Sequence, residues 1–120
     1  MKLNDYQEKA METCMDSCYN DSYMLLNLVA EVGEFAGKIA KAIRKDEIEV
    51  YASNFLYYSN PERDQIIEKE LMLEAGDILW QLAGLCKTMC WTLEDVAQAN
   101  LDKLASRQQR GVIDGNGDHR

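Results

Sequence analysis

Two pairs of carboxylates, each with a three-residue spacing, lie inside apolar-rich runs of this 120-residue chain. The first pair is Glu31 and Glu34, and the second is Glu74 and Asp77. Residues three apart share one face of an α-helix, so two packed helices would bring four carboxylates to one place. Four like charges held together are stable only when cations neutralise them. The sequence therefore predicts two facing helices that share a divalent metal site.

Apolar residues recur at three- and four-residue spacings in both runs, which is typical of amphipathic helices. Glu31 and Glu74 fall on these apolar stripes, whereas Glu34 and Asp77 lie beside them. The stripes consist of Met24, Leu28, Phe35, Ile39 and Ala42 in residues 24–43, and of Leu71, Ile78, Leu82, Leu85 and Met89 in residues 71–89. Burying an ionised carboxylate without a partner is costly, so the two glutamates are expected to pair or to bind metal.

The ligand chemistry favours a hard cation. Carboxylate oxygens are the ligands that Mg²⁺ takes, with Mn²⁺ as an alternative. The one histidine of the chain is His119 in the tail, so the Glu-x-x-His pairs of di-iron bundles are missing. This pattern indicates metal and phosphate chemistry rather than oxygen activation.

The composition sets further bounds. The length fits one domain, and a net charge of −8 argues against nucleic acid as a partner. The polar N-terminus predicts no signal peptide, and no apolar run is long enough to predict a membrane span. These features together predict a cytoplasmic protein.

Helical spacing and local start signals predict a mostly helical chain. Asn20, Asp21 and Ser22 form a break with an N-cap, Asn60-Pro61 is a second start signal, and Thr92 with Asp95 resembles a capping box. The predicted helices cover residues 3–18, 23–45, 61–90 and 93–109.

Two segments lie outside these helices. Residues 46–60 predict either a short helix or an ordered loop, whose aromatic residues would pack over the site. Residues 1–110 form the predicted single domain, and the Gly-rich tail, residues 111–120, is predicted to be extended.

Four cysteines form two pairs with a four-residue spacing, each predicted to lie on one helix face. They are Cys14 and Cys18, then Cys86 and Cys90. A zinc site with four thiolates, or two disulfides, is open as an interpretation. We favour simple packing of small apolar side chains where two helices touch.

Several segments of the chain resemble a known family. The segment from Asn27 to Lys38, with its Glu-x-x-Glu, resembles the first signature of the MazG-like nucleoside triphosphate pyrophosphohydrolases. The segment from Glu70 to Trp80, with its Glu-x-x-Asp, resembles the second. The residues between Asn100 and Arg107, followed by Arg110-Gly111 and the last four residues, resemble the ending of short members.

The resemblance implies an all-α, four-to-five-helix bundle that assembles as a homodimer or a dimer of dimers. It implies Mg²⁺-dependent hydrolysis of a nucleoside triphosphate to the monophosphate and pyrophosphate. The implied metal ligands are Glu31, Glu34, Glu74 and Asp77, with Glu31 or Glu34 as the catalytic base. The implied substrate-binding residues are Lys38, Asn100 and Lys103.

Two departures from the family pattern concern base recognition. The spacer between the two carboxylate pairs, residues 35–73, is long compared with the tightest members. Gln81 stands where many relatives have an aromatic residue. The preferred base therefore does not follow from the resemblance.

Other functions compete with hydrolysis. The same helices suit a non-catalytic nucleotide- or metal-binding module, and the cysteines suit a zinc-binding protein. Either carboxylate pair alone is also typical of a solvated helix face in a structural protein. The placement of Glu31 and Glu74 on apolar stripes argues against this last interpretation. The apolar circumference of residues 24–43 predicts a homo-oligomer.

Overall fold

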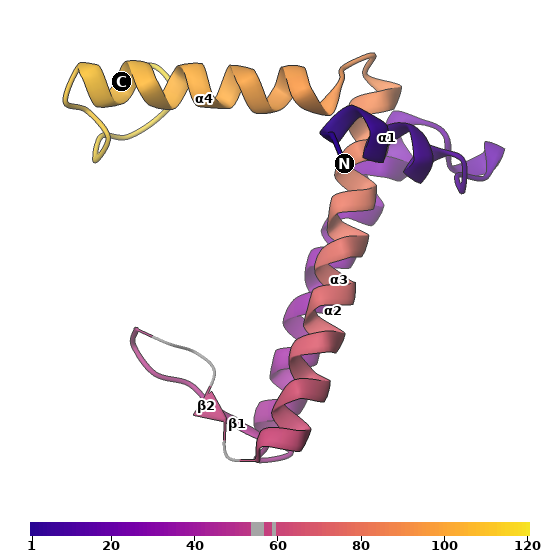
Figure 1. Ribbon diagram of the computed structural model, residues 1–120, viewed down its shortest axis with the longest axis vertical. Coiled ribbons are helices and arrows are strands. Elements are labelled where there is room, and N and C mark those ends of the chain that lie inside the picture. Colours follow the sequence, from indigo (N-terminus) through magenta and orange to yellow (C-terminus); the bar gives the residue numbers. More distant parts are fainter. Residues whose placement is uncertain (54–56, 59) are drawn as a thin grey trace.

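The structure is a computed structural model that describes residues 1–53, 57–58 and 60–120. The secondary structure of these residues is helical apart from one short β-ribbon (Figure 1). The elements are α1 (Leu3–Met11), a 3-10 turn η1 (Asp16–Cys18), α2 (Asp21–Arg44), β1 (Ile48–Glu49), β2 (Tyr57–Tyr58), α3 (Pro61–Thr88) and α4 (Leu93–Gln109). The predicted all-helical fold class is thus confirmed.

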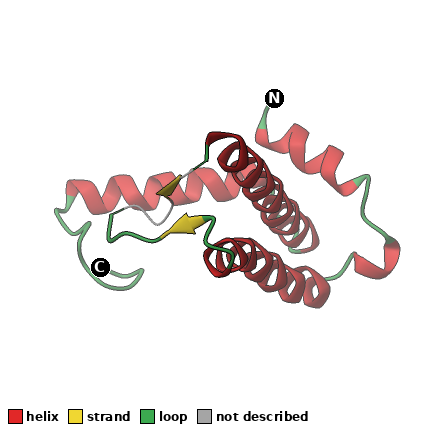
Figure 2. Cartoon of the chain, turned by 90° about the horizontal axis from the view of Figure 1, so that it is seen from below, coloured by secondary structure: helices red, strands yellow, loops and turns green. Residues whose placement is uncertain are grey.

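The helices α2 and α3 lie side by side and antiparallel, and this hairpin forms the body of the molecule (Figures 1 and 2). At its lower end the buried residues are Ala42, Ile48, Ile67 and Leu71, with Phe35 and Ile39 packed against them. The predicted stripe of α2 therefore faces α3. Glu31 lies on this stripe between apolar neighbours, as its spacing predicts.

The prediction of the apolar stripe on α3 is partly wrong. Leu82 is 37% exposed and Met89 is 40% exposed, whereas Gln81 and Cys86 are buried. The buried line shifts because α1 packs on this end of α3, where Cys86 lies in a cluster with Ala83, Leu93 and Tyr6. Leu82 and Met89 are left on the outside of the hairpin.

The three local start signals are confirmed. The Asn20 side chain accepts a hydrogen bond from the Tyr23 amide, which caps α2. Asn60 accepts from the amides of Glu62 and Arg63, with proline at the first turn of α3. Thr92 accepts from the Asp95 amide and caps α4.

The first helix is shorter than predicted, because α1 ends at Met11 rather than continuing to residue 18. The carbonyl of Ala10 accepts hydrogen bonds from Trp80 Nε1 at 3.0 Å and from Thr13 Oγ1 at 2.7 Å. These donors occupy the carbonyl oxygen that would accept a hydrogen bond from the amide of Cys14 if the helix continued. The cysteines at 14 and 18 consequently do not share a helix face.

The described residues of segment 46–60 contain no helix, and they include two short strands as well as loop. Ile48 pairs with Tyr58, and Glu49 pairs with Tyr57, in a two-stranded antiparallel ribbon. Phe55, one of the aromatic residues expected over the site, lies outside the described residues, as does its neighbour Leu56.

The last helix, α4, leaves the upper end of the hairpin as an arm (Figure 1). Its start is fixed by Gln7, a buried side chain of α1. Gln7 Nε2 donates to the carbonyls of Ala83 and Trp91, and its Oε1 accepts from the Leu93 amide at 3.1 Å. The radius of gyration is 17.8 Å, against about 14 Å for a compact chain of this length. One chain therefore does not close a helix bundle by itself.

The tail is folded back rather than extended, which corrects the prediction for residues 111–120. Gly111 has a φ of 68° and ends α4 in the left-handed conformation that glycine tolerates. Arg120 donates from Nε to the Val112 carbonyl at 3.0 Å, so the chain end returns to the end of α4. Within the described residues, no helix has the length and apolar character that spanning a membrane requires.

Candidate metal site

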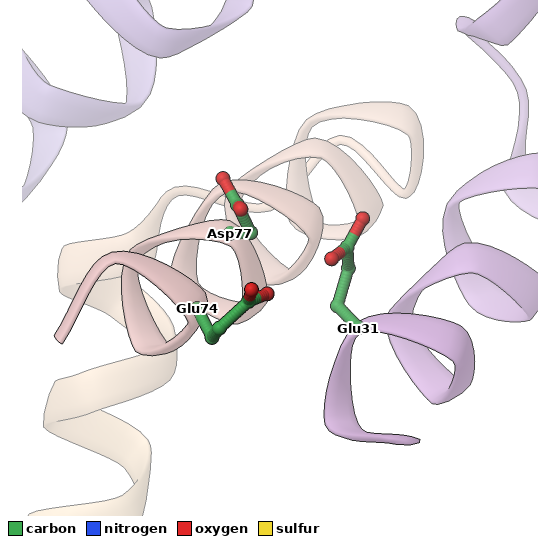
Figure 3. A group of neighbouring side chains, drawn as sticks. All are labelled: Glu31, Glu74 and Asp77. Atoms are coloured by element: carbon green, nitrogen blue, oxygen red, sulfur yellow. The ribbon is translucent and has the colours of Figure 1, made fainter. Parts of the chain in front are cut away.

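Three of the four predicted carboxylates come together between α2 and α3. Glu31, Glu74 and Asp77 each offer an oxygen, and these oxygens lie within 4.8 Å of one another. Figure 3 shows Glu31 reaching from one helix toward Glu74 and Asp77 on the other. Glu31 and Glu74 are half-buried and Asp77 is exposed, so the group lies at the rim of the hairpin. We call these three residues the carboxylate cluster.

Glu31 is the most constrained member of the cluster. Its Oε1 accepts a hydrogen bond from Asn27 Nδ2 at 3.0 Å, whereas its Oε2 is buried without a hydrogen-bond partner. Burial raises the pKa of the Glu31 carboxyl, and the charges of Glu34 and Asp77 raise it further. An unpartnered buried oxygen beside two more carboxylates is a donor set that suits a divalent cation.

Glu34 lies outside the carboxylate cluster. It is exposed on α2, although its charge contributes to the raised pKa of Glu31. A step of three residues falls about 60° short of a full helical turn, so Glu34 points to one side of the contact with α3. The structure therefore brings three of the four predicted carboxylates together.

Lys38 lies one turn after Glu34 on α2 and contacts the carboxylate cluster. Its Nζ lies 3.5 Å from Glu74 Oε1. This contact compensates part of the negative charge at the site and leaves a cation beside it. A triphosphate bound at the cluster would therefore meet a positive side chain.

The other two predicted substrate residues lie on α4. Asn100 and Lys103 are exposed and line a cavity of about 530 Å³, together with Trp91 and Asp95. None of the described lining residues belongs to the carboxylate cluster. Because α4 projects away from the hairpin, one chain does not bring Asn100 and Lys103 to its own cluster (Figure 1).

The cysteines do not form a metal centre. Cys14 and Cys18 are half-buried, Cys86 is buried and Cys90 is exposed. Burial raises the pKa of the Cys86 thiol and is also the largest cause of the raised pKa of Cys14, which disfavours thiolates. In the part of the chain that the structure describes, no cysteine joins a group of three or more metal-binding side chains.

Sequence reasoning missed two residues that contact predicted site residues, Asn27 and Asp118. Asn27 contacts Glu31, and its place four residues earlier on the same helix was a readable signal. Asp118 of the tail lies 3.2 Å from Lys103 Nζ and 2.8 Å from Arg107, a contact that depends on the folded tail. Gln81, which the sequence distinguishes only as a departure from the family pattern, is buried on α3 with an exposed fraction of 3%.

Comparison with known proteins identifies the family of the chain. The family model of the MazG nucleotide pyrophosphohydrolase domain matches residues 20–112, which contain all four predicted carboxylates. The chain is 35% identical to the Gene 37 protein of Mycobacterium phage L5 over 131 residues, covering 100% of each chain. No solved structure matches the chain. The chain belongs to the MazG nucleotide pyrophosphohydrolase domain family.

Proposed function

We propose that the protein hydrolyses a nucleoside or deoxynucleoside triphosphate to the monophosphate and pyrophosphate, with Mg²⁺ as cofactor and Mn²⁺ as a substitute. The observation that carries this proposal is the carboxylate cluster, with its buried, unpartnered Glu31 oxygen, in a chain of the MazG family. A surface acidic patch would not explain why a carboxylate oxygen is buried without a partner.

The residues Glu31, Glu74 and Asp77 hold the cation in this proposal. When bound, the cation neutralises phosphate charge and lowers the pKa of water. The cluster positions the triphosphate at the rim of the hairpin, where Asp77 is exposed and substrate has access.

Glu34 is the proposed general base. It is exposed beside the cluster and is therefore available to a water molecule that approaches the substrate. The water oxygen forms a bond to phosphorus, the bond to the departing pyrophosphate breaks, and the proton passes to the carboxylate of Glu34. Lys38 is placed to bind the triphosphate, since its Nζ already lies beside Glu74.

Asn100 and Lys103 act on the same substrate only if another chain brings them there. We propose a homodimer, alone or within a dimer of dimers, in which α4 of one protomer reaches the carboxylate cluster of its partner. The extended arm and the 17.8 Å radius of gyration support this arrangement.

The exposed apolar residues of the hairpin support the same proposal. Leu26 is 72% exposed and Val29 is 66% exposed on α2, while Met72 and Leu73 are 74% and 63% exposed on α3. Helices with apolar side chains on opposite faces are normally buried on both. A second hairpin packed here would complete a four-helix bundle.

The test is a substrate panel. Purified protein is incubated with common and non-canonical ribo- and deoxyribonucleoside triphosphates, in Mg²⁺ or in chelator, and the products are separated. Metal-dependent release of monophosphate and pyrophosphate is expected. Diphosphate with orthophosphate would reject the cleavage position, and no turnover on any substrate would favour a non-catalytic binding module.

A pair of variants links turnover to the site. Glu34→Gln is expected to abolish hydrolysis while the far-ultraviolet circular dichroism is unchanged. Glu68→Gln, at an exposed glutamate of α3 outside the cluster, is the matched control and should retain activity. A fully active Glu34→Gln enzyme would overturn the role of Glu34.

A further inference from the structure

Each of the two inward glutamates has one of its carboxylate oxygens engaged by a neighbouring side chain. The amide of Asn27 donates to Glu31 Oε1 at 3.0 Å. The ammonium of Lys38 lies 3.5 Å from Glu74 Oε1. The Asn27 contact is the shorter, and it is made by a half-buried side chain within one helix.

The Asn27 contact divides the two oxygens of Glu31 into different roles. Oε1 is occupied by the amide, whereas Oε2 is buried and has no hydrogen-bond partner. With Oε1 held by the amide, Oε2 is the Glu31 oxygen that is left free to bind a cation. Hydrogen-bonded side chains behind a ligand commonly orient metal-binding groups in this way.

A carboxylate that presents one oxygen suits some cations better than others. Mg²⁺ and Mn²⁺ favour six oxygen ligands in octahedral geometry, which single oxygens satisfy. Ca²⁺ takes six to eight oxygens and commonly uses both oxygens of a carboxylate. Because the Asn27 amide already engages one lone pair of Glu31 Oε1, this oxygen is a weaker second ligand for Ca²⁺.

We propose that Asn27 is a positioning residue that makes Glu31 a one-oxygen ligand and thereby favours Mg²⁺ and Mn²⁺ over Ca²⁺ at the carboxylate cluster. This inference rests on the proposed metal site. It concerns selectivity among cations and does not depend on which nucleotide is hydrolysed.

The test measures metal binding without substrate. The dissociation constant of Mn²⁺ is measured by electron paramagnetic resonance for the full chain, and that of Ca²⁺ by displacement of Mn²⁺. Asn27→Leu removes the donor and keeps the number of side-chain heavy atoms, and Asn27→Ala removes it by truncation. Both variants are expected to bind Mn²⁺ about 10-fold more weakly. Ca²⁺ affinity should fall less, so the preference for Mn²⁺ over Ca²⁺ decreases.

The chain offers a matched control. Gln98 Nε2 donates to Asp102 Oδ1 at 2.8 Å, an amide-to-carboxylate pair with the same four-residue spacing on the exposed surface of α4. Gln98→Leu should leave the affinities for both cations unchanged. Melting in chelator checks that all variants are folded.

The outcomes separate this inference from the proposed site. A wild-type Mn²⁺ affinity in the Asn27 variants, or an equal weakening of Mn²⁺ and Ca²⁺, would overturn the role of Asn27. An equal effect of Gln98→Leu would overturn it as well. Glu31→Gln should weaken Mn²⁺ binding more than either Asn27 variant, and if it does not, the metal site itself is wrong.

Discussion

Lys38 Nζ lies 3.5 Å from Glu74 Oε1, so a cation on α2 contacts a carboxylate on α3 at the edge of the carboxylate cluster. The lysine side chain is 40% exposed and the glutamate side chain is 14% exposed. Ion pairs this close to solvent contribute between zero and about 1 kcal/mol to stability. The ion pair therefore explains little of the stability, and substrate binding is the role that we propose for Lys38.

Lys38→Met is the first prediction. The variant should lose less than about 1 kcal/mol of unfolding free energy, because the ion pair is partly exposed. Its KM for the triphosphate should rise about 10-fold, because a cation that meets phosphate is removed. Urea denaturation and steady-state kinetics check the two effects separately. Lys9→Met, at an exposed lysine of α1, should change neither, and an unchanged KM in Lys38→Met would remove Lys38 from the site.

The pH dependence of stability provides the second prediction. Burial, Glu34 and Asp77 raise the pKa of Glu31 in the folded protein, and Glu74 adds to this effect while Asn27 opposes it. Above the ordinary glutamate pKa of about 4.3, the folded state then binds more protons at Glu31 than the unfolded state. The free energy of unfolding therefore falls as the pH rises through this window.

The measurement compares melting temperatures of wild type and Glu31→Gln in chelator across that window. As the pH rises, the melting temperature of Glu31→Gln should increase relative to that of the wild type, because the variant has no carboxylate to ionise at this position. Excess Mn²⁺ should reverse the order, since it stabilises the ionised cluster of the wild type. If the difference between the two melting temperatures stays the same across this pH window, this account of Glu31 is wrong.

The third prediction concerns the corner between α3 and α4. Gln7 is 3% exposed and is hydrogen-bonded to the carbonyls of Ala83 and Trp91 and to the amide of Leu93. Gln7→Leu leaves these groups without their side-chain partner and should cost about 2–3 kcal/mol of unfolding free energy. Urea denaturation measures this cost.

Asn4→Ala is the control variant for Gln7→Leu. Asn4 makes a similar pair of hydrogen bonds with Glu94, donating to its carboxylate and accepting from its amide, but both contacts are exposed. Water replaces the lost partner there, so the cost should stay below about 1 kcal/mol. Equal losses in the two variants would show that burial does not decide the role of Gln7.

Local chemistry explains which parts of the fold the sequence could predict. The starts of α2, α3 and α4 follow from Asn20, Asn60 and Thr92, because each side chain caps amides within three residues of itself. The inward face of α2 follows from its periodicity. Glu31 was readable for the same reason, since an acidic residue interrupts an apolar stripe.

The features that sequence could not predict depend on distant contacts. The early end of α1 requires Trp80, which is 70 residues from Ala10. The angle of α4 depends on Gln7, which was indistinguishable from any polar helix residue. Glu34 was expected inside the cluster because its spacing places it near Glu31, but spacing alone does not fix the rotation of one helix against another.

The fourth prediction tests whether two protomers share a site. By light scattering the wild type should be at least a dimer at micromolar concentration, and Leu26→Glu should shift it toward monomer, because Leu26 is 72% exposed on the apolar hairpin. Ile113→Glu, at a 51% exposed residue of the tail, should not change the assembly. A monomeric wild type would contradict the proposed homodimer.

A mixing experiment then distinguishes sharing from simple association. Glu34→Gln damages the hairpin half of the proposed site and Lys103→Ala damages the α4 half, so each variant alone should be inactive. If α4 serves the partner's cluster, a heterodimer of the two variants has one site with both defects and one intact site. Random exchange in an equimolar mixture should then restore about one quarter of wild-type activity. No recovery, with exchange verified by mass spectrometry, would mean that Lys103 does not act on the partner's cluster, and the arm would then serve assembly alone.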